Sequence, residues 1–182
     1  MKKKLLLFSL VLVILFGFFK LFLNNDVMKP IDFKDTEPEL QIEKYFEGGA
    51  YAYGILQDRK GKVIRQFRAN MFGKYENNIL TLEEFFYWHD GENQKRIWKI
   101  KKIDEHNYIG TAEDVVGEAK GASYGSAFKF EYYLMVPFKG KNIKIKFDDW
   151  IFKQSDKIAI NRATLSKFGF KVGELTVVFQ KH

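Results

Sequence analysis

The longest hydrophobic run lies at the start of the chain. Residues 5–23 read LLLFSLVLVILFGFFKLFL, with Lys20 as the one charge, and Lys2, Lys3 and Lys4 precede them. A helix of 19 residues rises about 28 Å, which is close to the hydrocarbon thickness of a bilayer. No A-x-A-like cleavage site or lipidation cysteine follows, so residues 1–23 are predicted to be an uncleaved anchor. The basic N-flank then predicts a single pass through the inner membrane, with the rest of the chain on the periplasmic side.

A polar stretch and a β-patterned domain follow the predicted anchor. Residues 24–41 contain Pro30 and Pro38 and show no periodicity, which is typical of a tether. A short helical turn is expected near 42–46. Beyond it, turn signals such as Asp58-Arg59-Lys60-Gly61 and Asp90-Gly91-Glu92 separate β-type segments. The chain is therefore divided into an anchor (1–23), a tether (24–41) and one β-rich domain (42–182).

Alternation of apolar and polar residues is clearest in residues 128–138, where even positions are apolar and odd ones mostly polar. This period of two predicts a strand with one buried face. About nine such strands in meander order, without helices to cover a sheet, can hide their edges by closing. The predicted fold is all-β, a lipocalin-like (calycin-like) antiparallel up-and-down β-barrel preceded by the transmembrane helix, with a β-sandwich as the alternative.

The alternation of apolar and polar residues is interrupted within residues 143–153. Apolar residues occupy odd positions up to Phe147, whereas Trp150 and Phe152 are even. A bulge at Asp148-Asp149 would reconcile the halves and turn one carboxylate inward. On the next segment, Arg162 shares its parity with two isoleucines, so it is predicted to be partly buried and paired with Asp149 or Trp150.

These residues are the candidates for ligand binding or for closing one end of the barrel. The full set is Asp148, Asp149, Trp150, Asn161, Arg162 and Lys167. A structural ion pair is the first interpretation, a ligand anchor the second, and catalysis by paired carboxylates the third.

Composition removes several classes of function. With the four lysines of the N-terminal segment set aside from 30 basic residues, 26 remain against 23 acidic ones, a net of +3. Charges alternate without a basic block, which disfavours a nucleic-acid partner. There is no cysteine, and the histidines at 89, 106 and 182 lack metal-ligand spacing, so no metal or cofactor is expected. No catalytic motif is present, and an enzyme is not expected.

Several short motifs resemble one known family. They are Gly54-Ile-Leu-Gln-Asp-Arg59 with Gly61, Asp90-Gly91-Glu92 followed by Trp98, Asp114-Val-Val-Gly117, Phe147-Asp-Asp-Trp150, and Asn161-Arg162 followed by Ser166-Lys-Phe-Gly169. On these the domain is similar, over about residues 45–180, to the proteobacterial envelope proteins of domain of unknown function 3833. The resemblance implies a lipocalin-type barrel and a lipid context. Family members usually carry a lipidation cysteine, which this chain lacks.

The expected function is a membrane-anchored binding module for an apolar or acyl-chain ligand, such as a lipid or fatty acid. Barrels of this size hold one small ligand, and the aromatic content suits an apolar interior. Arg162 or Lys167 would then meet an acidic head group. The alternatives are a structural or protein-interaction barrel filled by its own side chains and, less favoured, an enzyme with Asp148 or Asp149 as general base. A cavity of roughly 300 Å³ or more would favour binding.

Overall fold

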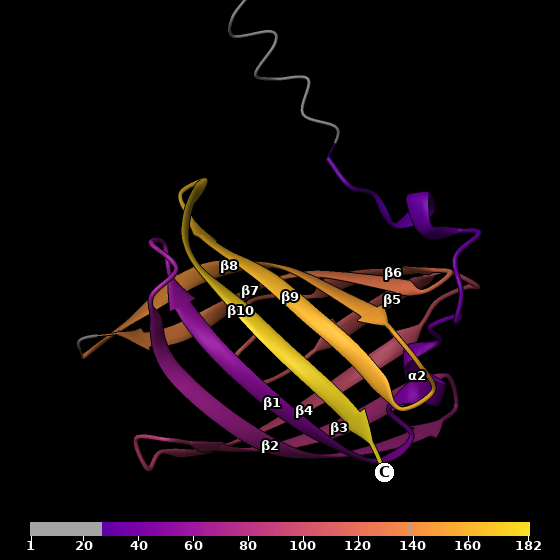
Figure 1. Cartoon of the computed structure of the whole chain (residues 1–182), viewed down its shortest axis with the longest axis horizontal. Helices are drawn as coiled ribbons and strands as arrows, with labels where there is room; N and C mark the ends of the chain where they lie inside the picture. Colours follow the sequence, from indigo (N-terminus) through magenta and orange to yellow (C-terminus); the bar gives the residue numbers. More distant parts are fainter. Residues whose placement is uncertain (1–26, 139) are drawn as a thin grey trace, which may run out of the picture.

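The computed structural model describes residues 27–138 and 140–182, which form a closed antiparallel barrel of ten strands (Figure 1). The strands are β1 (Gly48–Asp58), β2 (Val63–Glu76), β3 (Ile79–Trp88), β4 (Asn93–Lys102), β5 (Asn107–Thr111), β6 (Ala119–Tyr124), β7 (Ala127–Phe138), β8 (Lys141–Lys153), β9 (Ile158–Lys167) and β10 (Phe170–Lys181). Each pairs with its sequence neighbours, and β1 pairs with β10 to close the sheet. The predicted all-β up-and-down barrel is confirmed.

The barrel wall follows the alternation seen in the sequence. Along β7, the side chains of Phe128, Phe130, Tyr132 and Leu134 are buried, and the residues between them are more exposed. Their rings join Trp98, Tyr108 and Phe147 in one aromatic interior. Because strand side chains alternate between faces, one face of each strand supplies this core.

A short helix closes one end of the barrel. Helix α2 (Ile42–Tyr45) precedes β1, and Ile42 and Phe46 are buried. The Tyr45 hydroxyl donates to the carbonyl oxygens of Lys157 (3.0 Å) and Phe179 (3.2 Å), which fixes the helix to the strand ends. Figure 1 shows α2 beside the end of β10, with the β1–β2, β3–β4, β7–β8 and β9–β10 turns at the opposite end.

The segment before α2 lies along the outside of the wall. The 3-10 helix η1 (Pro30–Phe33) places the Phe33 ring 5.9 Å from that of Trp150 and 5.6 Å from that of Phe152. Farther along, the Leu40 amide donates to the carbonyl of Gly125 at 2.7 Å. The described part of the predicted tether, residues 27–41, therefore packs on the barrel. Whether it also spaces the barrel from a membrane stays a prediction.

The predicted anchor, residues 1–23, lies outside the described residues. Within 27–138 and 140–182, no helix combines the length and the hydropathy needed to cross a bilayer.

Candidate ligand site inside the barrel

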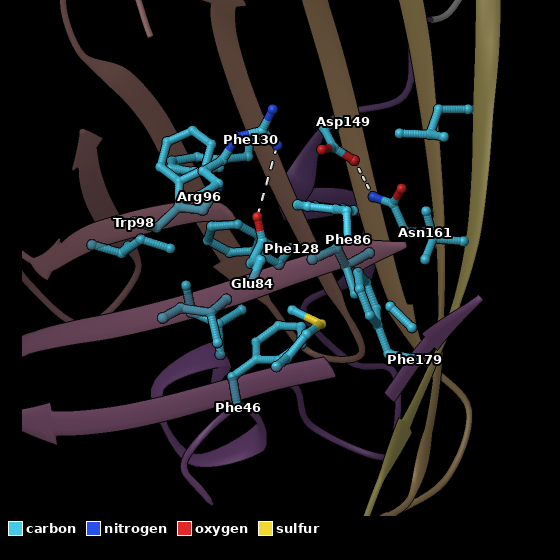
Figure 2. A pocket seen from close by; sticks show the side chains of 18 of the residues that line it. Phe46, Glu84, Phe86, Arg96, Trp98, Phe128, Phe130, Asp149, Asn161 and Phe179 are labelled. Atoms are coloured by element: carbon cyan, nitrogen blue, oxygen red, sulfur yellow. Dashed lines mark hydrogen bonds and ion pairs between the residues drawn. The ribbon is translucent and has the colours of Figure 1, made fainter. Parts of the chain in front are cut away.

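The barrel encloses a cavity of about 110 Å³ whose lining is mostly aromatic and aliphatic. Ile42 and Phe46 approach it from the α2 end. The rest of the lining comes from all the strands except β5 and β6, and Figure 2 shows rings of Phe86, Trp98, Phe128, Phe130 and Phe179 among them. Such a space is well below the roughly 300–1,000 Å³ typical of small-molecule pockets. It is comparable with the roughly 150 Å³ that admits benzene in an engineered apolar cavity.

Asp149 is a carboxylate directed into this apolar space. Its Oδ2 accepts a hydrogen bond from the Tyr132 hydroxyl at 2.9 Å, and its Oδ1 accepts one from the Asn161 side-chain amide (Figure 2). The same amide also donates to the Trp150 carbonyl at 3.2 Å, which orients the side chain. Burial raises the pKa of Asp149 from 3.8 to about 6, although both hydrogen bonds oppose the rise.

Glu84 is a second carboxylate that lines the same cavity. Its side chain is 12 % exposed, and its Oε2 lies 3.7 Å from Nη1 of Arg96. Among the described residues, that oxygen accepts no hydrogen bond. Burial raises the pKa of Glu84 from 4.5 to about 7, because the loss of water outweighs the attraction of Arg96.

Arg96 is held mainly by a third carboxylate. Its Nε and Nη2 donate to Asp114, with distances between 2.7 and 3.1 Å. This two-pronged pairing is the strong geometry for arginine and carboxylate. The guanidinium of Arg96 therefore pairs mainly with Asp114, which lies in the loop between β5 and β6. It compensates the charge of Glu84 only weakly.

The interior therefore offers a surplus of carboxylate oxygens. Asp149 and Glu84 line the cavity, and the guanidinium of Arg96, which also lines it, already pairs with Asp114. A group entering the cavity would meet acceptors at one side and apolar rings elsewhere. Such a lining suits a ligand with a small apolar body and a hydrogen-bond donor or a cation at one end. In the described part of the chain, no cluster of three or more His, Asp or Glu could hold a metal ion.

The structure divides the residues of the sequence-predicted site between the two faces of the wall. Asp149 and Asn161 point inward, as described above. Asp148 faces outward, with its Oδ2 3.2 Å from the Lys129 ammonium. Trp150 also faces outward and is buried beneath Phe33.

Two further candidates lie on the outside of the barrel. The Arg162 side chain is 65 % exposed, and its Nη2 lies 3.5 Å from a carboxylate oxygen of Glu174. Lys167 ends β9, with its ammonium 5.4 Å from the Phe168 ring. Neither can meet a head group inside the cavity.

The prediction that Arg162 is partly buried and paired with Asp149 or Trp150 is wrong. Register places it across from Trp150, but its partner is Glu174. The inward residues of β9 are Ala159, Asn161 and Ala163, which are small because aromatic rings fill the space opposite. The isoleucines that share the parity of Arg162 are only partly covered on the outer face.

The predicted bulge at Asp148-Asp149 is absent, because β8 pairs without a shift to β7 and to β9. Inward parity stays odd throughout, so Asp149 faces inward without any irregularity. Trp150 and Phe152 broke the sequence pattern because they form an outer apolar patch that Phe33 covers. Apolar residues on an outer strand face that another segment covers give the same sequence pattern as a strand whose inward positions change from odd to even.

The sequence reasoning missed Glu84, Arg96, Asp114 and Tyr132. The sequence pattern pointed to two of them, Glu84 and Arg96. Glu84 falls in phase with the buried Leu80 and Leu82, and Arg96 falls in phase with Trp98. A charged residue in phase with buried apolar ones needs a partner in the interior.

A closed up-and-down barrel whose wall converges on one interior space defines a lipocalin-like protein. The chain belongs to the family described as "Protein of unknown function (DUF3833)", whose sequence profile matches residues 20–181. This confirms the family suggested by the motifs. Among curated proteins, none matches the sequence.

Two solved structures show the same fold. A protein of unknown function from the DUF3598 family of Nostoc punctiforme PCC 73102 is 12 % identical, with a TM-score of 0.60 over 80 % of this chain and 51 % of that one. The chain thus spans about half the length of that protein. The S-type phycobiliprotein lyase of Guillardia theta is 5 % identical, with a TM-score of 0.54 over 77 % and 90 %. At these identities the likeness concerns the fold alone.

Proposed function

We propose that the barrel is a binding protein for a small, mainly apolar ligand that carries a hydrogen-bond donor or a cationic group. The observation that carries this proposal is Asp149, an inward carboxylate fixed by Tyr132 and Asn161 at the edge of an aromatic cavity. A buried carboxylate is unfavourable unless something compensates it. Tyr132 and Asn161 compensate Asp149 in part, whereas Oε2 of Glu84 accepts no hydrogen bond among the described residues. A donor on a ligand would supply the missing compensation, and the rings would take up the apolar part.

The interior modifies the ligand class expected from the sequence. A cavity of about 110 Å³ has room for a ring or a short branched chain, not for a long acyl chain with the side chains as they stand. A fatty-acid carboxylate would also face Glu84 and Asp149, which is unfavourable once these are ionised. The acyl-chain hypothesis thus requires both rearrangement and protonation of the interior.

Binding of three ring compounds tests the proposal. Benzylamine, benzyl alcohol and benzoate share a ring and differ in the head group, and decanoate represents an acyl chain. Titration would be followed by tryptophan fluorescence, since Trp98 lines the cavity, and by calorimetry. At pH 8, where Asp149 is ionised, the amine should bind most tightly, the alcohol next, and benzoate and decanoate least.

The adjacent residue on β8 gives a matched control. Asp149→Asn should weaken benzylamine binding about tenfold or more, which corresponds to about 1.4 kcal/mol. Asp148→Asn should leave it unchanged, because Asp148 faces outward towards Lys129. If benzoate or decanoate binds best, the carboxylates do not select the ligand. If none of the four compounds binds, the alternative of a structural barrel with a filled interior is favoured. The small volume of the cavity would also support that alternative.

Placement of the barrel at the inner membrane is part of the proposal and rests on the sequence. The hydrophobic run of 5–23 and the lysines before it are the support. Added protease should digest the barrel in spheroplasts but not in intact cells. Protection of the barrel in spheroplasts would contradict the periplasmic orientation.

A further inference from the structure

The turn between β9 and β10 exposes two phenylalanines to solvent. The Phe168 side chain is 89 % exposed and that of Phe170 is 76 % exposed. Val172, which lies in the register shift between Lys171 and Gly173, is also exposed. These side chains add little to the packing of the barrel. We refer to residues 167–172 as the aromatic tip.

The backbone at Phe168 is itself unfavourable for the residue that occupies it. Its φ is +52°, and Gly169 follows with a φ of +82°. Two successive positive values define the tight hairpin turn that favours Asn-Gly or Gly-Gly. A bulky residue in this conformation is an outlier, because its Cβ crowds the backbone. Phe168 is therefore unfavourable both in its backbone and in its exposure, and such residues cluster at functional sites.

Cationic residues are frequent in the aromatic tip and in turns at the same end of the barrel. The pairing of β1 with β10 places the β1–β2 turn beside the tip, and the β7–β8 turn belongs to β8, which pairs with β9 from Lys146 onward. Asp58 is the one acidic residue in residues 58–62, 140–144 and 167–171. Its carboxylate accepts hydrogen bonds from backbone N–H groups of its own turn. The basic ones are Arg59, Lys60, Lys62, Lys141, Lys144, Lys167 and Lys171. Lys171 pairs with Glu174 at 2.7 Å, and the other six form no ion pair within the described residues.

The start of the described chain and the aromatic tip border one surface groove. Val27 and Met28 line the same surface groove as Gly169 and Lys171. The hydrophobic run predicted to span the membrane ends at Leu23, four residues earlier. Four extended residues reach at most roughly 14 Å. A bilayer that held the predicted anchor would therefore be within reach of the tip.

We propose that the aromatic tip and the lysines around it dock on the surface of a bilayer that contains anionic lipids. Phenylalanines would enter the boundary between head groups and acyl chains, and the cations would pair with lipid phosphates. The exposed rings suit the apolar boundary of the bilayer, and the basic side chains suit its anionic head groups. The barrel is then held at two points, with the end opposite α2 towards the membrane. This docking rests on the membrane placement proposed above and is independent of the ligand proposed for the interior.

A single fluorescent label measures the depth of the tip. The chain has no cysteine, so Val172→Cys gives one labelling site and keeps both phenylalanines. The full chain would be reconstituted into vesicles of phosphatidylcholine, with and without phosphatidylglycerol, that contain a lipid quencher at head-group depth. We expect a blue shift and strong quenching in the anionic vesicles. The same label at Asp156, which is 95 % exposed in the β8–β9 turn at the opposite end, should stay in water.

Variants separate docking from mere proximity. Phe168→Ser combined with Phe170→Ser should abolish the quenching while circular dichroism stays unchanged, because neither ring is packed in the core. The proposal is overturned if the labels at 172 and 156 respond alike. It is also overturned if quenching at 172 ignores the phenylalanines and the anionic lipid, because the anchor alone would then explain it. A label at 172 that is shielded from aqueous iodide without vesicles would indicate a protein surface instead.

Discussion

Replacement of Glu84 by glutamine should stabilise the barrel at neutral and alkaline pH. The pKa of Glu84 rises from 4.5 to about 7 on folding because burial disfavours its charge. A raised pKa means that the folded state holds the proton more tightly than the unfolded state does. The contribution of Glu84 to stability is therefore fully present below about pH 4.5 and is lost as pH rises to about 7. Above that pH an ionised carboxylate remains in the interior.

The pKa values set the size of the effect. A rise from 4.5 to about 7 corresponds to about 3 kcal/mol at 1.36 kcal/mol per pH unit. Glutamine has nearly the same shape and no charge, so Glu84→Gln should be more stable than the native protein by up to about 3 kcal/mol at pH 8. At pH 4, where Glu84 is protonated, the two proteins should differ little. Arg96 pairs with Asp114 in the native protein, so its charge should stay compensated in the variant.

Urea unfolding from pH 4 to pH 8.5, followed by tryptophan fluorescence, measures the difference. Glu83→Gln is the matched control, because Glu83 faces outward, is 40 % exposed and pairs with Lys95 at 2.7 Å. Its replacement should change the free energy of unfolding by less than about 1 kcal/mol. If Glu84→Gln is less stable than the native protein at pH 8, the ion pair with Arg96 outweighs burial, and the charge of Glu84 is not uncompensated in the interior.

Four further substitutions test the assignment of faces and the backbone strain at Phe168. Asn161→Ala should lower the free energy of unfolding by about 1–3 kcal/mol, because it removes a hydrogen-bond donor from the buried carboxylate of Asp149. Arg162→Ala should change that free energy by less than about 1 kcal/mol, because its ion pair is exposed. Equal denaturation midpoints for the two variants would contradict this. Phe33→Ala should uncover Trp150 and red-shift its fluorescence, so an unchanged spectrum would count against the packing of 27–41. Phe168→Asn should raise the free energy of unfolding by about 1 kcal/mol, measured in urea, and a loss of stability would remove the argument from strain.

The fold could be predicted from the sequence because its turns and its alternation agree. Asp58-Arg59-Lys60-Gly61 and Asp90-Gly91-Glu92 both lie between strands in the structure. The turn at Phe168-Gly169 was missed, because phenylalanine is not expected at a positive φ. The predicted count of about nine strands is one short of the ten in the structure.

The site was harder to predict, since parity shows which residues share a face but not which face is inside. Asp149 was identified as a possible inward carboxylate, but for a reason that the structure contradicts. Arg162 was placed inside because its isoleucine neighbours are apolar, yet they lie on the outer wall. Pairing of Arg96 with Asp114 joins β4 to a distant loop, and no short-range pattern encodes such a contact.

The pairing of β1 with β10 also constrains how the protein can be made. Ala50 lies across from Lys181, so the sheet closes through partners separated by most of the domain. Until β10 has been synthesised, a growing chain has two free sheet edges and an open aromatic interior, which is a state prone to aggregation. Contacts of such long range also slow folding. A chaperone that holds the chain until its final strand emerges would therefore raise the yield of folded protein.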